Sequence, residues 1–342
     1  GREFTRRLLD RITDTPGQTE TCLRELKAIE LIYEKSLFPE PAYLFKHVLT
    51  QEVAYNSLLV HRRRELHHRI GRAIEELYAD RLAEQYEVLA YHFSRAEERM
   101  KALEYVLKAG DKAAQAYANR EALALYEQAV GLLPEANVAQ RADVLKKLAT
   151  VTQYLGDADA SLRYAESAVE LYEKLGDKRN AVAMHLHIQV LYGGQWDGAR
   201  EDLGLKHLEA AAALVEDNPD SVEKGLVHQR TGHLYLHRAE PTTTLAWAQR
   251  AVDMFARLGV QMGTSLGTAL TYMGRIDEGV AYSEKNWEPV RKGAIPVVMA
   301  VMGHELSLTL ALARDVPRRI AEKRDRPNPQ RSEARPSPRR QE

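Results

Sequence analysis

Three histidines, His228, His233 and His237, have the spacing in this sequence that most resembles a metal site. Residues four apart share one face of a helix, so His233 and His237 would present two imidazoles together. A zinc site needs at least three protein ligands, and no carboxylate completes a ligand pattern such as His-Glu-x-x-His. We therefore interpret these residues as groove and surface histidines of a helical repeat, and predict neither a metal nor a catalytic residue in this chain.

Cysteine and arginine also have structural explanations. Cys22 is the only cysteine, which excludes a disulfide within the chain and favours a reducing, cytoplasmic location. It falls in an expected helix with no histidine nearby in sequence, so we predict a buried structural thiol rather than a nucleophile. The arginines from Arg62 to Arg72 are interleaved with Glu65, Glu75 and Glu76, which is typical of a solvated helix face rather than a surface that binds nucleic acid.

The composition sets limits on the class of protein. The chain has 342 residues, a net charge of −1 and 28% charged residues, so it has no overall attraction for nucleic acid. No apolar run approaches the ~20 residues that span a bilayer, so we expect no membrane association. The chain begins with Gly1 rather than Met, and we expect it to be a piece of a longer protein.

The elements that position these residues are helices, because small residues recur regularly between about residues 82 and 315. The recurring positions are Ala102, Val106 and Ala109, then Ser161, Ala165 and Ala168, then Thr244, Ala248 and Ala251, then Gly279 and Ser283. Small side chains let two helices of a pair cross closely, and a period of about 34 residues is typical of tetratricopeptide repeats. We predict an all-α fold dominated by a right-handed tetratricopeptide-like solenoid over 82–315, in which the helix from about Met100 to Tyr117 serves two pairs.

Turn residues divide the solenoid into pairs. We expect loops between pairs at 134–137, 176–177, 217–220 and Gly293, and tight turns within pairs at 156–157, 193–194, 240–241 and Gly274. After Val316 the chain is rich in proline and arginine and poor in apolar residues, so we expect residues 316–342 to be disordered.

One stripe of the first helix in each pair is expected to line a concave groove. Its members are predicted to be Lys146, Thr150, Gln153, Tyr192, Gln229, His233, His237 and Tyr272, together with Asp143, Thr264, Thr268 and the apolar Met184 and Ile188. Amide, imidazole, hydroxyl and aromatic groups suit an extended peptide, whose backbone needs hydrogen bonds along its length. The alternative is that the groove packs against another domain of the same protein.

Residues 1–60 follow a different pattern. A short amphipathic helix containing Phe4 and Leu8, a helix over 19–29, and two strands at 31–33 and 42–45 outline a small winged-helix-like domain with a β-hairpin. Further helices are expected over 50–59 and 62–78, the second within a linking segment at 61–81.

The segment Phe45-Lys46-His47-Val48-Leu49-Thr50-Gln51-Glu52-Val53-Ala54-Tyr55-Asn56-Ser57-Leu58 carries a resemblance to a known family. It resembles the F-x-H-x-L-x-x-E-x-x-Y-x-x-L stretch that follows the ATPase core of large bacterial STAND (signal transduction ATPase) regulators. The most similar group joins a class III adenylate/guanylate cyclase, an AAA-like ATPase and tetratricopeptide repeats. Arg62-Arg63-Arg64-Glu65-Leu66-His67 resembles their R-R-x-x-L-H helix, and Gly1-Arg2-Glu3-Phe4 the start of their winged helix.

The resemblance implies a regulatory role beside an ATPase core. In that setting His47 would sense the nucleotide phosphates, and ATP and magnesium would belong to the upstream domain. The sequence itself has no G-x-x-x-x-G-K-[ST] phosphate loop, so we predict a non-catalytic arm that binds a protein, a peptide or its own ATPase and cyclase domains. Two alternatives remain open: this chain is part of a cyclase or ATPase whose catalytic domains lie upstream, or it is a winged-helix transcriptional regulator.

Overall fold

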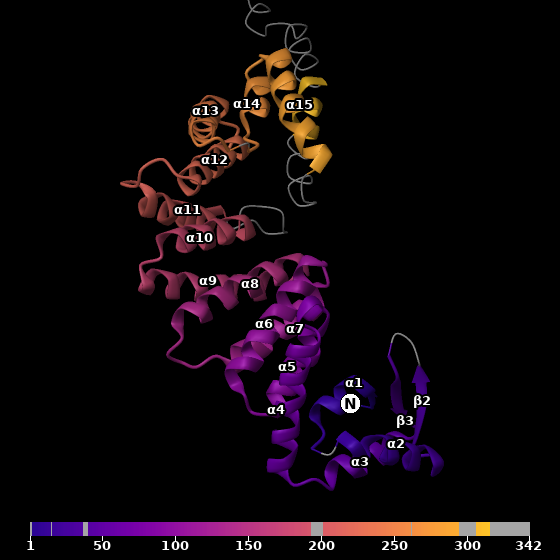
Figure 1. The fold of residues 1–342 in the computed structure, drawn as a ribbon. Coiled ribbons are helices and arrows are strands. Elements are labelled where there is room, and N and C mark those ends of the chain that lie inside the picture. The colour runs from indigo at the N-terminus through magenta and orange to yellow at the C-terminus, as the bar shows by residue number, and fades with distance from the viewer. Residues whose placement is uncertain are drawn as a thin grey trace, which may run out of the picture. The chain divides into compact units, whose positions relative to one another are not determined.

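A computed structural model describes residues 2–14, 16–36, 40–192, 201–260, 262–293 and 306–314 (Figure 1). The chain divides into two compact units, Gly1–Leu171 and Tyr172–Glu342. The expected turn at Gly193–Gly194 and the expected disordered tail lie outside the described residues.

The first unit begins with a small mixed domain. Strands β1 (Glu3–Thr5), β3 (Ala42–Phe45) and β2 (Ile32–Ser36) form an antiparallel sheet in that order, and Phe4 pairs with Tyr43. Helix α1 (Arg6–Ile12), the short 3-10 helix η1 (Pro16–Gln18) and α2 (Thr19–Ala28) precede β2. Buried Leu23, Ile32 and Tyr43 form the core of this domain, because they are its apolar residues on facing elements.

The predicted hairpin and both early helices are confirmed, but β1 was not predicted. Phe4, which the sequence assigned to the first helix, lies in β1 instead. Three residues are too short to show strand alternation, so only pairing with β3 defines this strand. The connection to the solenoid consists of α3 (Val48–Asn56), α4 (Val60–Leu77) and the irregular 3-10 segment η2 (Ala79–Gln85).

Paired helices follow in the same unit. They are α5 (Tyr86–Arg95), α6 (Arg99–Gln115), α7 (Asn119–Leu132), α8 (Val138–Tyr154) and α9 (Ala158–Leu175), and the boundary between the units falls within α9. Helix α6 packs against both α5 and α7, which confirms that this helix serves two pairs. The buried core of these helices includes Phe93, Leu103, Val106 and Leu148.

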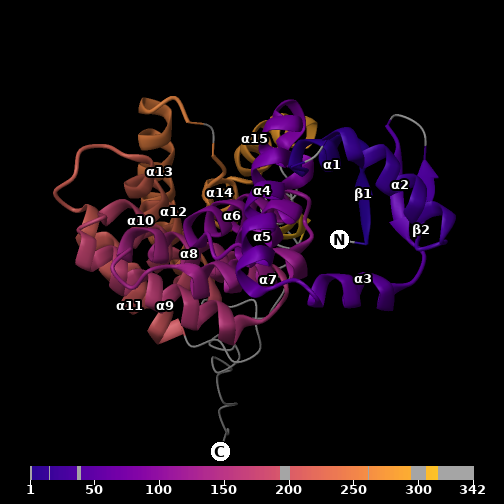
Figure 2. The ribbon, with the colours of Figure 1, turned by 60° about the horizontal axis from the view of Figure 1, so that its bottom comes forward.

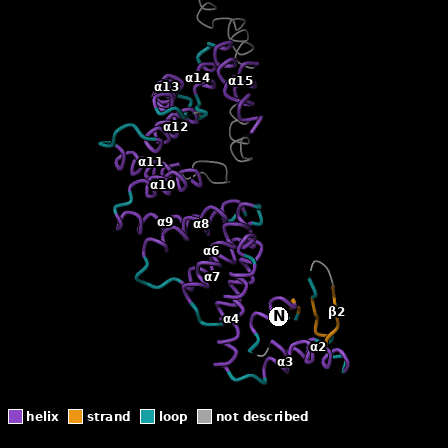
Figure 3. Tube along the Cα trace, viewed as in Figure 1, coloured by secondary structure: helices purple, strands orange, loops and turns teal. Residues whose placement is uncertain are grey.

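The second unit continues the pattern with α10 (Lys178–Tyr192), α11 (Glu201–Val215), α12 (Val222–His237), α13 (Pro241–Arg257), α14 (Leu266–Tyr272), α15 (Ile276–Gly293) and a helix at 306–314. The strongest packing is between the two members of a pair, as in α12 with α13 and α10 with α11. Figure 3 shows that the strands are confined to the N-terminal domain, within the residues that it colours. The predicted loops at 134–137, 176–177 and 217–220 all fall between helices.

Small residues occupy the closest helix contacts, as the repeat pattern requires. A Cβ added at Gly279 of α15 would lie 2.5 Å from the carbonyl oxygen of Gly267 in α14. Glycines also face aromatic rings: a Cβ at Gly110 would lie 2.7 Å from Tyr126, and one at Gly71 would lie 2.8 Å from Phe93. These distances are far below van der Waals contact, so the helices approach only because the side chain is hydrogen.

Candidate functional site

The predicted groove residues of the second unit lie on the first helices of successive pairs. Tyr192 is on α10, Gln229, His233 and His237 are on α12, and Tyr272 is on α14. Helix α10 packs directly against α12, although α11 lies between them in sequence. Tyr192, Gln229 and His233 are half-buried, whereas His237 and Tyr272 are exposed. We call these five residues the inner row.

Contacts within the unit orient most of the inner row. The amide of Gln229 donates a hydrogen bond to the carbonyl oxygen of Gly263, which lies just before α14. The rings of His233 and His237 meet edge to face with centroids 4.7 Å apart, and Tyr192 stacks on His207 of α11 at 6.2 Å. The row is therefore a partly ordered surface of aromatic and polar groups.

The predicted groove residues of the first unit, Lys146, Thr150 and Gln153, share one face of α8 and are half-buried. The hydroxyl of Thr150 donates to the carbonyl oxygen of Lys146 at 3.0 Å, so its proton is used within the helix. Lys147, which follows Lys146 in sequence, is not part of this face, since it pairs with Asp111 and lies over the Tyr126 ring.

Met184 and Ile188 do not belong to a groove surface, contrary to the sequence prediction. Their exposed fractions are 3% and 0%. Both are apolar residues of α10, a helix that packs against α11 and α12, so burial in those contacts is more favourable than exposure. Thr264 and Thr268, which were predicted for the same stripe, are also buried, with exposed fractions of 6% and 1%. The five residues of the inner row remain partly or fully accessible.

His47 and Cys22 have outcomes of different kinds. His47 lies two residues after β3, at the N-terminal boundary of α3, and its exposed side chain makes no capping hydrogen bond. Its proposed nucleotide-sensing role remains a prediction.

Cys22 is exposed, so the expectation of a buried thiol is wrong. The buried face of α2 contains Thr19 and Leu23, and Cys22 lies about 100° around the helix from Leu23.

Two histidines that the sequence did not single out form a buried pair. Nδ1 of His67 in α4 lies 2.9 Å from Nδ1 of His92 in α5, and Nε2 of His67 lies 3.1 Å from the Tyr55 hydroxyl of α3. Burial lowers the pKa of His67 to about 4, and burial with the neighbouring His67 lowers the pKa of His92 to about 3. Both rings are therefore neutral at pH 7, and one donates to the other.

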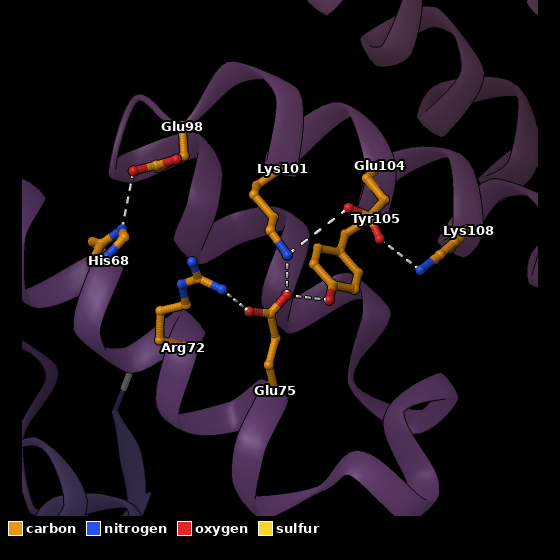
Figure 4. A network of polar contacts seen from close by, with 8 residues as sticks. All are labelled: His68, Arg72, Glu75, Glu98, Lys101, Glu104, Tyr105 and Lys108. Carbon is orange, nitrogen blue, oxygen red and sulfur yellow. Dashed lines mark hydrogen bonds and ion pairs between the residues drawn. The ribbon is translucent and has the colours of Figure 1, made fainter.

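A second polar cluster joins α4 to α6 (Figure 4). The largely buried carboxylate of Glu75 accepts from Lys101 and from the Tyr105 hydroxyl, both at 2.5 Å, and pairs with Arg72 at 3.3 Å. Burial of Glu75 opposes its ionisation, but the hydrogen bonds from Lys101 and Tyr105 outweigh burial and keep its pKa below the usual value. Glu75 is thus held by three partners, and Lys101 also pairs with Glu104 at 4.0 Å, so the cluster links α4 to α6.

Four of the five arginines of α4 pair with carboxylates, in the pairs Arg62–Asp14, Arg62–Glu65, Arg64–Glu97, Arg69–Asp14 and Arg72–Glu75. The fifth, Arg63, lies over the Tyr55 ring. Hydrogen bonds from Arg69 and Arg62 hold the pKa of Asp14 below its usual range. A phosphate backbone would have to displace these carboxylates, so this face of α4 is a poor nucleic-acid surface.

The described part of the chain was predicted to hold neither a metal site nor a membrane-spanning helix. Within those residues, no group of three or more His, Cys, Asp or Glu side chains is arranged to hold a metal ion. None of the described helices is both long and apolar enough to cross a bilayer.

Comparisons with known proteins bear on the fold. No family model and no curated protein matches the chain. The solved structure of apo RapI aligns with a TM-score of 0.52 and 12% identity, over 92% of this chain and 86% of that one. A Pyrococcus horikoshii STAND protein with a tetratricopeptide repeat sensor aligns with a TM-score of 0.47 and 16% identity, over 91% of this chain and 50% of that one.

BtubC from P. vanneervenii aligns with a TM-score of 0.44 and 17% identity, over 79% of this chain and 98% of its own. The chain thus spans half the length of the STAND protein that it matches. Identities this low bear on the fold alone. The fold is a tetratricopeptide-like helical solenoid that follows a small domain with a three-stranded sheet.

Proposed function

We propose that this chain is a protein-interaction and regulatory arm whose solenoid binds an extended protein segment along the inner row. The observation that carries the proposal is the direct packing of α10 on α12, which places Tyr192 and His233 on adjacent first helices. A peptide lying across successive helices would meet aromatic faces and hydrogen-bonding side chains in turn.

A selection of random linear peptides on the whole chain tests this proposal. We expect the selected peptides to lose affinity about tenfold with the double variant His233→Ala and Tyr272→Ala, since each side chain would contribute part of the contact. The matched control is Gln249→Ala, an exposed residue on α13, the second helix of the same pair. Peptides that bind the double variant and the control equally would remove the inner row as the binding surface.

The wider context that we propose is a bacterial, cytoplasmic STAND-type signalling protein, in which the N-terminal domain adjoins an ATPase core. The support is the sequence segment 45–67 and its place between the small β-containing domain and the solenoid. In a longer chain that carries such a core, His47→Ala should change nucleotide exchange or basal activity. Unchanged exchange and activity would exclude His47 as a nucleotide sensor.

The alternative within the same context is that this chain is the downstream part of an adenylate/guanylate cyclase or ATPase whose catalytic domains lie upstream. A winged-helix DNA-binding regulator has less support, because four of the five α4 arginines are already paired with carboxylates. A gel shift at low salt that weakens steeply with added salt would favour DNA binding, and the absence of a shift would exclude it.

A further inference from the structure

A large cavity lies within the first unit, between the N-terminal domain and the first helices of the solenoid. Its volume is about 1090 Å³. One side of the cavity is formed by β1, α1, α2 and β3, and the other by α4, η2 and α5. Figure 2 shows where α1, α2, α4 and α5 lie. Val88, Tyr91 and Cys22 line it and are exposed, so the cavity is open to solvent.

The cavity walls are mainly apolar. Leu9, Leu23, Leu26 and Phe45 line it from the N-terminal domain, and Ile70 and Val88 line it from α4 and α5. The first four belong to the core of the sheet domain, whereas Ile70 packs on the separate core of the solenoid helices. Protein interiors are normally close-packed, and an apolar space of this size between two cores is typical of a ligand site.

The charges around the cavity are unbalanced. Its acidic lining residues are already paired, Glu3 with Lys35 at 2.6 Å and Glu87 with Lys112 at 2.9 Å. The guanidinium of Arg2 donates only to neutral acceptors in the described part of the chain, the carbonyl oxygens of Phe45 and Lys46. Those two bonds orient Arg2 and leave its charge unneutralised.

Apart from Glu87, whose charge is paired with Lys112, the polar groups that line the solenoid side are neutral. His92 lines the cavity with its Nδ1 engaged by His67, and its low pKa keeps the ring uncharged near pH 7. Tyr78 also lines the cavity, and its hydroxyl donates to Glu40 at 3.1 Å. Among the described residues that line this cavity, Arg2 is therefore the only cationic side chain at neutral pH.

We propose that this cavity binds a small molecule with a long apolar body and a single carboxylate, of the class of long-chain carboxylic acids. The apolar body would lie between α2 and α5, and the carboxylate would pair with Arg2, whose fork of N–H donors matches two oxygens. Such a ligand contacts both the sheet domain and the first solenoid helices, so its binding would fix one against the other. The proposal does not depend on the inner row.

Titration of the whole chain with the fluorescent fatty acid cis-parinaric acid tests the site. We expect saturable binding, displacement by palmitic acid, and displacement by cetyl alcohol that is about tenfold weaker because the alcohol lacks the charge. Arg2→Gln should remove that preference while cetyl alcohol binds as before. Equal displacement by acid and alcohol with the unaltered chain would overturn the role of Arg2.

Filling the cavity provides the matched pair of variants. Val88→Trp should abolish binding of the probe, whereas Leu155→Trp, at a similarly exposed position outside the cavity, should leave it intact; the two side chains are 41% and 36% exposed. Cys22 gives a readout that needs no variant, since it is the only thiol and lines the cavity. Palmitic acid should slow maleimide labelling of Cys22, and an unchanged labelling rate at saturating acid would overturn the proposal.

Discussion

Ala239 ends α12 with a φ of 56°, in the left-handed region that favours glycine. After it, the N–H of Glu240 donates to the carbonyl oxygen of Tyr235, the same turn that Gly274 makes between α14 and α15. Gly274 has a φ of 85°. The two turns therefore have the same hydrogen bonds, but only the turn at Ala239 places a residue with a Cβ in the left-handed conformation. A non-glycine residue in that conformation costs about 1 kcal/mol or more.

Ala239→Gly should raise the free energy of unfolding by about 0.5 kcal/mol, since relief of strain exceeds the greater entropy of an unfolded glycine. The reverse change, Gly274→Ala, should lower it by about 1 kcal/mol. Urea unfolding of the two variants beside the unaltered chain measures both. A destabilised Ala239→Gly variant would contradict the strain.

The turns show what single residues reveal in advance. Glycine marks the turns at 156 and 274, and Pro241 marks the one after Ala239, so all three were predicted from the sequence. Glu97 and Tyr117 also adopt positive φ, at 61° and 58°, and neither residue type signals a left-handed turn. Only the helices on both sides reveal those two turns.

Pairs of helices in this fold are spaced by glycines that face rings. Gly110 of α6 lies under Tyr126 of α7, whose hydroxyl donates to Asp111 at 2.8 Å and so fixes the ring in place. Burial and the bond to Asp111 raise the pKa of Tyr126, so the phenol stays protonated and able to donate. A methyl group at Gly110 has no room unless the ring or the helix moves.

Gly110→Ala should therefore lower the free energy of unfolding by about 2 kcal/mol, because overpacking outweighs the better helix propensity of alanine. Gly131 in α7 is the matched control, since nothing lies within 4 Å of a Cβ added there. Gly131→Ala should be neutral or stabilising by up to about 1 kcal/mol in the same thermal or urea experiment. Equal changes in the free energy of unfolding for the two variants would show that the Tyr126 ring moves aside without cost, and would contradict overpacking at Gly110.

Most helices were predictable because small residues recur with the repeat, and the dual role of α6 followed from spacing alone. The predicted groove was only partly right. Met184 and Ile188 have the sequence spacing of groove residues, but both are buried where α10 packs against its neighbouring helices. The His67–His92 pair was missed because its members are far apart in sequence, on α4 and α5. Pairing of that kind depends on how helices pack, which the periodicity does not encode.

Neutral buried histidines make the stability of the whole molecule depend on pH. Burial lowers the pKa of His67 to about 4 and of His187 to about 4, and burial also lowers the pKa of His207 and His228. His92, at about 3, is the most shifted. These histidines lie in both units, so acid should destabilise both units.

The free energy of unfolding should decrease as the pH falls from about 6.5 toward 4. In that window the unfolded chain binds protons that the folded chain does not, so stability rises with pH and is fully regained above about 6.5. The variant His92→Asn keeps a hydrogen-bond partner for His67 but has no group that titrates in this window. The free energy of unfolding of the variant should therefore fall less steeply with acid than that of the unaltered chain, and the two slopes should differ by up to about 1.4 kcal/mol per pH unit. Denaturant unfolding at several pH values measures the slopes, and parallel curves would contradict this origin.

The ion-pair cluster around Glu75 has a practical consequence for anyone dividing this polypeptide into fragments. Helix α4 supplies Gly71 against the Phe93 ring, Ile74 to the buried core, and Glu75 to Lys101 and Tyr105 of α6. A recombinant fragment that starts near residue 80 would uncover Phe93 and leave Lys101 with the more distant carboxylate of Glu104, at 4.0 Å, in place of Glu75. A fragment that starts ahead of Val60 keeps all of α4, and with it the contacts of Gly71, Ile74 and Glu75.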